Sequence, residues 1–545
     1  MISIPRKTQY RLNKIAANRL VFLFWLLLSL ILIFSCASER QAGFRHYPYL
    51  QNPGSTAMII MWFSETNASG QLTYTEEGGT KSSQIKSTPT FADALKYSTW
   101  EDTTFFEDGA PAIPFRHRVK IDDLKPATRY EYTVAQGADS FSSSFMTAPD
   151  RDVPVRFIVY ADSETEPEST GKHTQWDDPK SDAPRTYLID QTDGYHNNLQ
   201  VINDREPDLI IIAGDLVESG GEQRDWDEFW LHNTSPGHEH SIASRIPILA
   251  AMGNHEYFEG PKTGRYNQPG SGRAASKYLS YFEYPSNHAQ RGEQNSRYYS
   301  LKYGPATLIV VDLCNNSPGK SAEDTNFFLL GENEPGGGFA PDFGPHSEQY
   351  KWIEKQLTEA QQNSLFTFVV FHHAPYSSGP HGVPPGEDGK TDPQSGRATR
   401  ILTPMFLQYG VDAVFNGHDE MWERSEISGL ELKPDGSKSE HSIQFYDVGI
   451  GGDGLRAPIQ GLENPYQQFL VHTDVPEKWE GGILLDGGKH YGHLEVDIVP
   501  QDSAHWQATL KPIYILPQLG KDGKTYSTYS RRMYDDKITL VRALN

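Results

Sequence analysis

The stretch DLIIIAGD, residues 208–215, is an apolar run that ends in glycine and aspartate. Runs of this kind, without polar alternation, predict strands that are buried on both faces of a sheet. Amphipathic segments such as EQYKWIEKQLTEA (348–360) predict helices between them. We therefore expect residues 151–545 to form an α/β domain of layered β-sheets flanked by helices. Similar runs occur in VRFIVYAD (155–162), IPILAAMGN (246–254), ATLIVVD (306–312), LFTFVVFHH (365–373) and VDAVFNGH (411–418).

Residues 44–150 have a different pattern, which predicts an all-β sandwich. TAMIIMWFS (56–64) and GQLTYT (70–75) have the composition of strands, and RHRVKIDDLKPATRYEYTVAQG (116–137) predicts a strand, a turn and a second strand. Short strands separated by Pro, Gly and Asp turns are typical of sandwiches, and this segment resembles a fibronectin type III domain. The last β-rich tail, residues 490–516, is expected to complete a sheet of the α/β domain.

Residues 1–36 predict a targeting segment. Basic residues precede an apolar run at 21–34, which is too short to span a bilayer comfortably and is followed by Ser35 and Cys36. This arrangement resembles a bacterial lipoprotein signal, in which Cys36 would be lipidated and would anchor the chain to a membrane. A plain signal peptide and a short uncleaved anchor are the alternatives. All three predict an exported protein, periplasmic or at the cell surface.

The charge balance excludes one class of partner. The chain has 49 Lys and Arg against 71 Asp and Glu, a formal net charge of −22. Sequence-independent binding to nucleic acid needs a basic surface, so we expect no nucleic-acid partner. An anionic substrate would have to be attracted by local cations. Nothing in the sequence indicates an oligomeric state.

Side chains that bind metals follow five of the apolar runs. They are Asp162, Asp215, Asn254, His372 and His418. In α/β sheets, ligands gather at the carboxyl ends of the strands, so residues far apart in the chain would meet at one edge. A single Asp after a strand usually caps a helix or turns the chain. Five such ends in series predict a metal site.

The order D…GD…GNHE…VxxH…GH resembles that of the calcineurin-like metallophosphoesterases. The sandwich that precedes it, PYLQ at 48–51 and QFYDVGIGG at 444–452 make the chain most similar to the purple acid phosphatase branch. The resemblance covers almost everything after Phe44.

The resemblance implies a dinuclear metal centre. Asp215 would bridge two metal ions. Asn254, His372 and His418 would hold the second metal, and Asp162 would hold the first.

Three further histidines would lie around the substrate. The resemblance implies that His255 donates a hydrogen bond or a proton beside the scissile phosphate. His381 falls where the family often has another histidine on the substrate side, although an exposed loop histidine is an equal alternative. His373 would support a ligand or face the substrate.

The chain departs from the family pattern at the first metal. Glu218 stands where the phosphatase branch has tyrosine, Glu164 where other members have histidine, and Glu420 where Gly-His-x-His has its second histidine. With Asp162 and Asp215, Glu420 offers oxygen ligands, and Glu164 and Glu218 are further candidates. Carboxylates favour harder cations such as Mn, Mg or Ca, while the mixed second site suits Zn, Mn or Fe. A degenerate first site with a weak metal or none is the alternative.

The resemblance implies a metal-dependent phosphoric ester hydrolase, most similar to an acid phosphatase acting on phosphomonoesters. A hydroxide that bridges the metals would attack phosphorus. A phosphodiesterase on the same scaffold is one alternative. A catalytically silent surface lipoprotein, which binds a ligand through its β-domain, is the other.

Overall fold

The computed structural model describes residues 43–176, 185–237, 241–264, 270–315, 325–326, 340–384 and 394–544. The predicted targeting segment 1–36, with Cys36, lies outside the described residues. Within the described part of the chain, no helix combines the length and the apolar character needed to cross a membrane.

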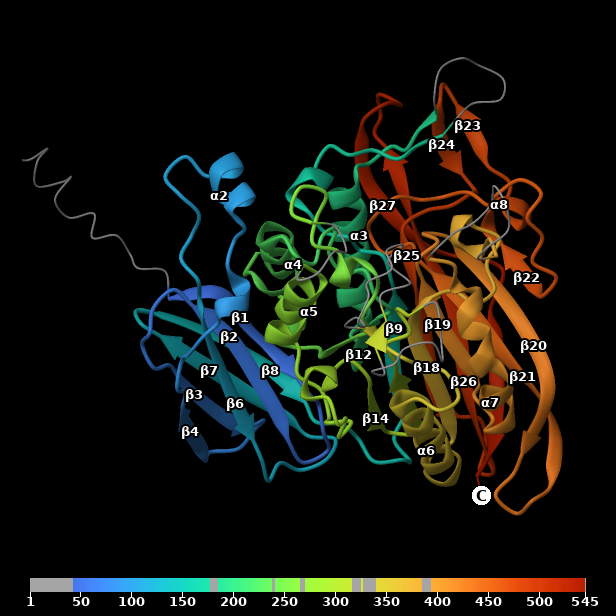
Figure 1. The fold of residues 1–545 in the computed structure, drawn as a ribbon, viewed down its shortest axis with the longest axis horizontal. Coiled ribbons are helices and arrows are strands. Elements are labelled where there is room, and N and C mark those ends of the chain that lie inside the picture. Colours follow the sequence, from blue (N-terminus) through green and yellow to red (C-terminus); the bar gives the residue numbers. More distant parts are fainter. Residues whose placement is uncertain are drawn as a thin grey trace, which may run out of the picture.

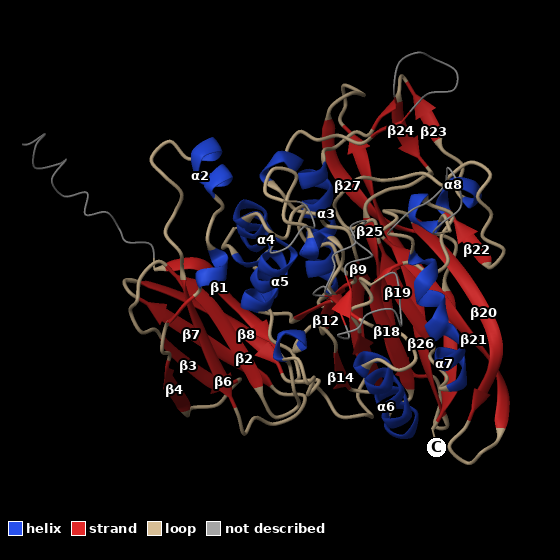
Figure 2. Ribbon diagram, viewed as in Figure 1, coloured by secondary structure: helices blue, strands red, loops and turns tan. Residues whose placement is uncertain are grey.

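The N-terminal part is a β-sandwich, as predicted (Figures 1 and 2). Its two antiparallel sheets have the strand orders β1-β2-β6-β5 and β4-β3-β7-β8. Trp62, Tyr130 and Tyr132 are buried between the sheets and form part of the sandwich core. The strands are β1 (Phe44–Gln51), β2 (Met58–Ser64), β3 (Gln71–Glu76), β4 (Ser82–Lys86), β5 (Thr90–Phe91), β6 (Phe115–Ile121), β7 (Arg129–Gln136) and β8 (Asp139–Met146).

The second part contains two large mixed sheets. The first has the order β13-β12-β9-β25-β26-β27, with β28 also paired to β26. Its strands β9, β12 and β13 run parallel to one another. The tail strand β25 pairs antiparallel with β9, so the C-terminal β-segment completes this sheet as expected. The strands are β9 (Val155–Tyr160), β12 (Leu209–Ile212), β13 (Ile248–Ala250), β25 (Gly492–Pro500), β26 (His505–Leu519), β27 (Tyr526–Met533) and β28 (Ile538–Ala543).

The second large sheet has the order β14-β15-β18-β19-β21-β20-β22. Its strands β15, β18, β19 and β21 are parallel. Phe157 of β9 lies against Phe368 of β18, with ring centroids 5.4 Å apart, so the two sheets share one core. The strands are β14 (Tyr299–Tyr303), β15 (Ala306–Val310), β18 (Phe366–His373), β19 (Ala413–Gly417), β20 (Trp422–Leu432), β21 (Lys438–Val448) and β22 (Gln467–Leu470).

Helices cover the outer faces of the two sheets (Figure 2). Val201 of α3 packs on Ile513 and Ile515 of β26, while α6 and α7 pack on the second sheet. Helix α6 begins where the sequence predicts and extends to Asn363, with the Ser347 side chain as its N-terminal cap. The helices are α2 (Thr99–Phe105), α3 (Gln191–Arg205), α4 (Gln223–Thr234), α5 (Gly270–Tyr281), α6 (Glu348–Asn363), α7 (Thr403–Gln408) and α8 (Val471–Asp474).

Short strands form two small additional sheets. The sheet β10-β11-β24-β23 lies at one end of the molecule, and β16 pairs with β17. These strands are β10 (Gln175–Trp176), β11 (Arg185–Thr186), β16 (Thr325–Asn326), β17 (Ala340–Pro341), β23 (Lys478–Glu480) and β24 (Ile483–Asp486).

Strand β2 joins the sandwich to the rest of the protein. Every one of its residues is buried, because it has an apolar partner on each face. Met58, Ile60 and Trp62 belong to the sandwich core, whereas Ile59, Met61 and Phe63 belong to the core of the two large sheets.

Aromatic side chains add a second contact between the sandwich and the rest of the protein, from strand β1 to helix α4. Tyr49 of β1 lies on Trp230 of α4, with centroids 4.2 Å apart, and the Tyr49 hydroxyl donates to the carbonyl of Tyr281. The sandwich and the sheets are therefore packed through a continuous apolar interface.

We predict that Trp230→Ala destabilises both parts of the molecule together. Trp230 is fully buried. Truncating a buried Trp costs about 3–5 kcal/mol of unfolding free energy. Denaturation followed by fluorescence and by circular dichroism should show a lower midpoint. Trp100→Ala, at a half-buried position of α2, is the matched control and should have a smaller effect. An unchanged midpoint for Trp230→Ala would argue against this interface.

Candidate metal centre

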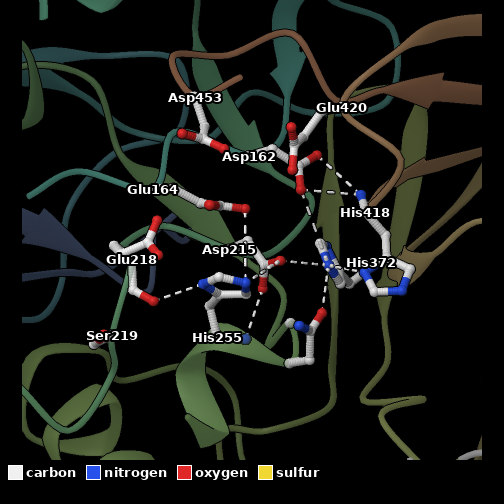
Figure 3. Close-up of polar contacts among 12 residues, drawn as sticks. Asp162, Glu164, Asp215, Glu218, Ser219, His255, His372, His418, Glu420 and Asp453 are labelled. Carbon is white, nitrogen blue, oxygen red and sulfur yellow. Dashed lines mark hydrogen bonds and ion pairs between the residues drawn. The ribbon is translucent and has the colours of Figure 1, made fainter. Parts of the chain in front are cut away.

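The five predicted ligand residues at the strand ends meet between the two large sheets, and Figure 3 labels four of them, Asp162, Asp215, His372 and His418. Asp162, Asp215 and Asn254 follow β9, β12 and β13 of the first sheet, while His372 and His418 lie at the ends of β18 and β19 of the second. All five side chains are buried. The sequence predicted convergence at one edge, and the structure places that edge where the two sheets face each other.

Four ligand-type atoms converge on one point. The Nε2 atom of His372 lies 2.8 Å from Oδ2 of Asp215, 3.1 Å from Oδ1 of Asn254 and 3.1 Å from Nδ1 of His418. These are the residues expected to hold the second metal.

The outer nitrogens of the two histidines fix where their protons lie. Nδ1 of His372 is 3.0 Å from the carbonyl oxygen of Ala213, and Nε2 of His418 is 2.9 Å from that of Gln394. A carbonyl oxygen only accepts, so each of these nitrogens donates. Nδ1 of His418 is then free to act as a ligand atom, and Nε2 of His372 can offer at most one proton to three acceptors. A bound cation would accept lone pairs from all four converging oxygen and nitrogen atoms, so this set of side chains fits a metal ion.

Asp215 belongs to both halves of the centre. It groups with His372 and His418 on one side and with Asp162 and Glu164 on the other. Burial alone would raise the pKa of Asp215, but the facing His372 and His255 lower it below its ordinary value. A carboxylate that stays ionised between two ligand sets suits the bridging position.

The other half of the centre consists of carboxylates. Glu164 groups with Asp162 and Asp215, and again with Glu420 and Asp453. Burial and the neighbouring negative charges raise the pKa of both Asp162 and Glu164 well above the ordinary range. Burial, together with Asp453, raises the pKa of Glu420 to about 8. Without a cation, the ionised forms of these carboxylates are therefore unfavourable.

Asp453 was missed by the sequence interpretation. It lies beside Glu164 and Glu420, and it accepts one hydrogen bond from the Gln191 side chain at 2.5 Å. Its signal in the sequence is its position directly after the two glycines that end the QFYDVGIGG stretch.

The backbone is left-handed at several of these residues. The φ angles are 55° at Asp162, 35° at Glu164, 52° at Asp215, 80° at His418 and 47° at Glu420. This region is unfavourable for residues other than glycine, and such strain gathers at functional sites. Here it turns the chain sharply after each strand, so that the ligands face the centre.

The glycines of the GD, GNHE and GH motifs make room for ligand side chains. A Cβ atom at Gly214 would lie 2.6 Å from Nδ1 of His372. At Gly253 and Gly417, a Cβ would collide with the carboxylates of Asp215 and Asp162. The motif glycines are thus required by close packing around the ligands.

His255 projects toward the carboxylate half. Its Nδ1 donates to the carbonyl of Glu218 at 2.6 Å, and its Nε2 is 3.9 Å from Glu164 and 4.0 Å from Asp215. Although burial opposes it, the negative charges of Asp215 and Glu218 raise the pKa of His255 to about 9. The Glu218 carboxylate also lies close enough to group with Glu164 and His255.

Glu256 ties two ligand loops together, a role that the sequence interpretation did not assign. Its carboxylate accepts the backbone N–H groups of Asp215, Leu216 and Gly253 at 3.0, 2.9 and 2.7 Å. The last residue of GNHE is therefore a positioning residue.

His373 and His381 both lie against His418. The ring of His381 stacks on that of His418 at 3.8 Å, and the ring of His373 lies 4.2 Å away. Nε2 of His381 accepts from Nη1 of Arg456 at 2.9 Å. Within the described residues, neither ring nitrogen of His373 has a hydrogen-bond partner.

Known proteins share both parts of the chain. Residues 173–419 match the calcineurin-like phosphoesterase family, and residues 46–148 match the purple acid phosphatase N-terminal domain. The chain is 23% identical over 399 residues to purple acid phosphatase 21 of Arabidopsis thaliana, covering 72% of this chain and 67% of that protein. It is 25% identical over 372 residues to Fe(3+)-Zn(2+) purple acid phosphatase 12 of the same plant, covering 65% and 63%.

These matches span about two thirds of the relatives' length. The solved structure of PhoD covers 93% of each chain with a TM-score of 0.55 at 12% identity, which supports the fold.

We predict that Gly214→Ala disrupts the centre by crowding His372. Gly78→Ala is the matched control, because Gly78 also has a positive φ, 74° against 96° at Gly214, but has open space around its Cβ position. Both variants carry the backbone strain, and only the first carries the clash. Elemental analysis should show metal lost from Gly214→Ala alone. Equal metal content in the two variants would contradict the packing argument.

Proposed function

The chain belongs to the calcineurin-like metallophosphoesterases, with the N-terminal domain of purple acid phosphatases, and we propose that it is an exported phosphomonoesterase with a dinuclear centre. The observation that carries this proposal is the convergence of Asp215, Asn254 and His418 on Nε2 of His372, beside a buried group of carboxylates. Export rests on the basic and apolar segment that ends at Cys36, with lipidation of Cys36 as the proposed membrane anchor.

Two metal ions would be held by different ligand sets. Asp215, Asn254, His372 and His418 would hold one ion through mixed oxygen and nitrogen ligands, which suit Zn, Mn or Fe. The other ion would be held through oxygen alone, which favours Mn, Mg or Ca. Its ligands would be Asp162, Asp215, Glu164, Glu420 and Asp453. When bound, the ions supply an activated water and neutralise charge on the phosphoryl oxygens.

The oxygen-rich half of the centre is built to hold a cation. Carboxylates replace the family's tyrosine and histidine, and burying several of them together is costly without positive charge. The group Glu164, Glu420 and Asp453 lies within the reach of one ion. This favours an altered but occupied first site over a degenerate one.

His255 is the proposed proton donor. Its Nδ1–H is held by the carbonyl of Glu218, which orients the ring so that Nε2 faces the space between Asp215 and Glu164. An imidazolium at that place can donate a proton to the leaving oxygen of the ester.

We expect Asp215→Ala to abolish hydrolysis and to lower the content of both metals, because this carboxylate serves both ligand sets. Asp435→Ala is the control, since Asp435 is an exposed carboxylate in the β20–β21 turn. The measurement compares p-nitrophenyl phosphate with bis(p-nitrophenyl) phosphate, alongside elemental analysis. Preference for the diester would replace the phosphomonoesterase by a phosphodiesterase. Absence of both metal and hydrolysis in the unaltered protein, after adding Mn, Zn, Fe or Ca, would sink the enzyme and favour a binding lipoprotein.

Removal of metal should also destabilise the fold. Burial and neighbouring negative charges raise the pKa of Asp162, Glu164 and Glu420, and at Glu420 the facing Arg456 opposes this rise only in part. An ion present at a hundred times its Kd contributes about 2.7 kcal/mol to the stability of the folded state. We therefore expect a chelator to lower Tm and readdition of metal to restore it. A Tm that does not respond to chelation would mean that the buried carboxylates hold no ion.

A further inference from the structure

Arg456 lies across the two halves of the metal centre. One end of its guanidinium, Nη2, is 2.5 Å from Oε1 of Glu420 in the carboxylate half. The other end, Nη1, donates to Nε2 of His381 at 2.9 Å, and the His381 ring stacks on the ligand His418. One side chain thus connects the carboxylate half to a ring that covers a ligand of the mixed half.

The backbone fixes the position of this arginine. The N–H of Arg456 donates to the carbonyl of Glu420 at 3.0 Å, so the two residues are joined through both backbone and side chain. The carbonyl of Arg456 accepts from Nε2 of His472 at 2.9 Å, and the carbonyl of the preceding Leu455 accepts from the Lys489 ammonium. The guanidinium is therefore pre-oriented and loses little freedom on binding a ligand.

Arg456 keeps donors available. A guanidinium carries N–H groups on Nε and on both Nη atoms. In the described part of the chain, its side chain forms an ion pair with Glu420 and a hydrogen bond with His381, and it is 40% exposed. Arg424 is the contrast: it is 8% exposed, and Asp536 and Gln444 accept from Nε and from both of its Nη atoms.

Two roles are open to such an arginine. In the first role, Arg456 does no more than balance the charge of the carboxylates, as Lys172 does at 3.8 Å from Asp453. That role does not explain why Nη1 turns away from the carboxylates to a neutral ring nitrogen, nor why the guanidinium remains exposed beside the centre. Binding of an anion explains both features, because a planar fork of N–H donors matches the oxygens of a phosphate.

We propose that Arg456 binds the phosphoryl oxygens of the substrate and favours dianionic phosphate monoesters over monoanionic diesters. Glu420 and His381 act as positioning residues for it. The inference rests on the proposed phosphoesterase function and refines its substrate class. A diester has one charged oxygen fewer than a monoester dianion, because a second alcohol is esterified to the phosphorus. Its binding is therefore strengthened less by a guanidinium at this place.

The test compares Arg456→Ala and Arg456→Lys with unaltered protein, all loaded with metal. Arg129→Ala is the matched control, since Arg129 is 47% exposed and pairs with a single carboxylate, Glu77, on the sandwich. Three quantities are measured: kcat and KM for p-nitrophenyl phosphate and bis(p-nitrophenyl) phosphate, calorimetric Kd for inorganic phosphate, and metal content.

For Arg456→Ala we expect kcat/KM for the monoester to fall, and Kd for inorganic phosphate to rise, by roughly 10- to 100-fold. The diester should change much less, and metal content should stay constant. Arg456→Lys keeps the charge but loses the fork, so it should lie between alanine and the unaltered protein. Arg129→Ala should leave all three quantities unchanged.

Equal losses for monoester and diester, or a loss of metal that accounts for the lower activity, would reduce Arg456 to a structural counter-charge and overturn the inference. An unchanged phosphate Kd in Arg456→Ala would overturn it as well. If the unaltered metal-loaded protein hydrolyses neither ester, the proposed function fails, and phosphate binding still decides whether Arg456 holds the anion. Absence of both hydrolysis and phosphate binding overturns both proposals.

Discussion

The centre depends on one electrostatic constraint: several carboxylates are buried together at the ends of strands. Asp162, Glu164, Asp215, Glu420 and Asp453 are all nearly inaccessible to water. Burial disfavours each ionised form, and each neighbour adds to the cost. Backbone N–H groups of His418 and His255 and the side chains of Arg456 and Lys172 offset only part of it. The remaining negative charge favours binding of cations in this region. Bound cations would in turn attract a phosphate to a protein whose net charge is −22.

The two-sheet architecture determines how the ligands divide. Residues from the first sheet are carboxylates and an amide, whereas those at the ends of β18 and β19 are histidines. The mixed ligand set forms where the sheets meet, and the oxygen set lies on the side of β9. Glu420 and Asp453 reach that side from loops after β19 and β21, so the second sheet also supplies proposed oxygen ligands.

The strand ends were predictable from the sequence because an apolar run followed by a ligand residue is a local pattern. Residues 208–215, for example, predict both strand β12 and the position of Asp215 just beyond it. Strand lengths were less predictable. Strand β13 ends at Ala250, and a little further on the N–H of Gly253 donates to the carboxylate of Glu256 instead of a neighbouring strand. The left-handed turns at Asp162 and Asp215 are likewise properties of the assembled centre.

Asp453 and Arg456 lay beyond a sequence interpretation for a different reason. Both follow β21 in a glycine-rich loop, and neither continues the series of strand-end ligands that made the other residues recognisable. Arg456 is also not a metal-ligand type, so its importance depends on contacts with Glu420 and His381, which are distant in the chain. The buried interface of β2 was hidden too, since MIIMWFS predicts burial without showing what covers its second face.

The two-faced burial of β2 bears on how the protein is divided into modules. The matched family regions, 46–148 and 173–419, suggest two exchangeable units. Yet Ile59, Met61 and Phe63 of the first unit contribute to the core of the second. If the two large sheets were separated from the sandwich, a contiguous apolar surface would be exposed on them. The sandwich would expose the apolar face of β2 that had covered it. Neither region is therefore expected to fold stably without the other, and side-chain changes in β2 must fit the packing on both of its faces.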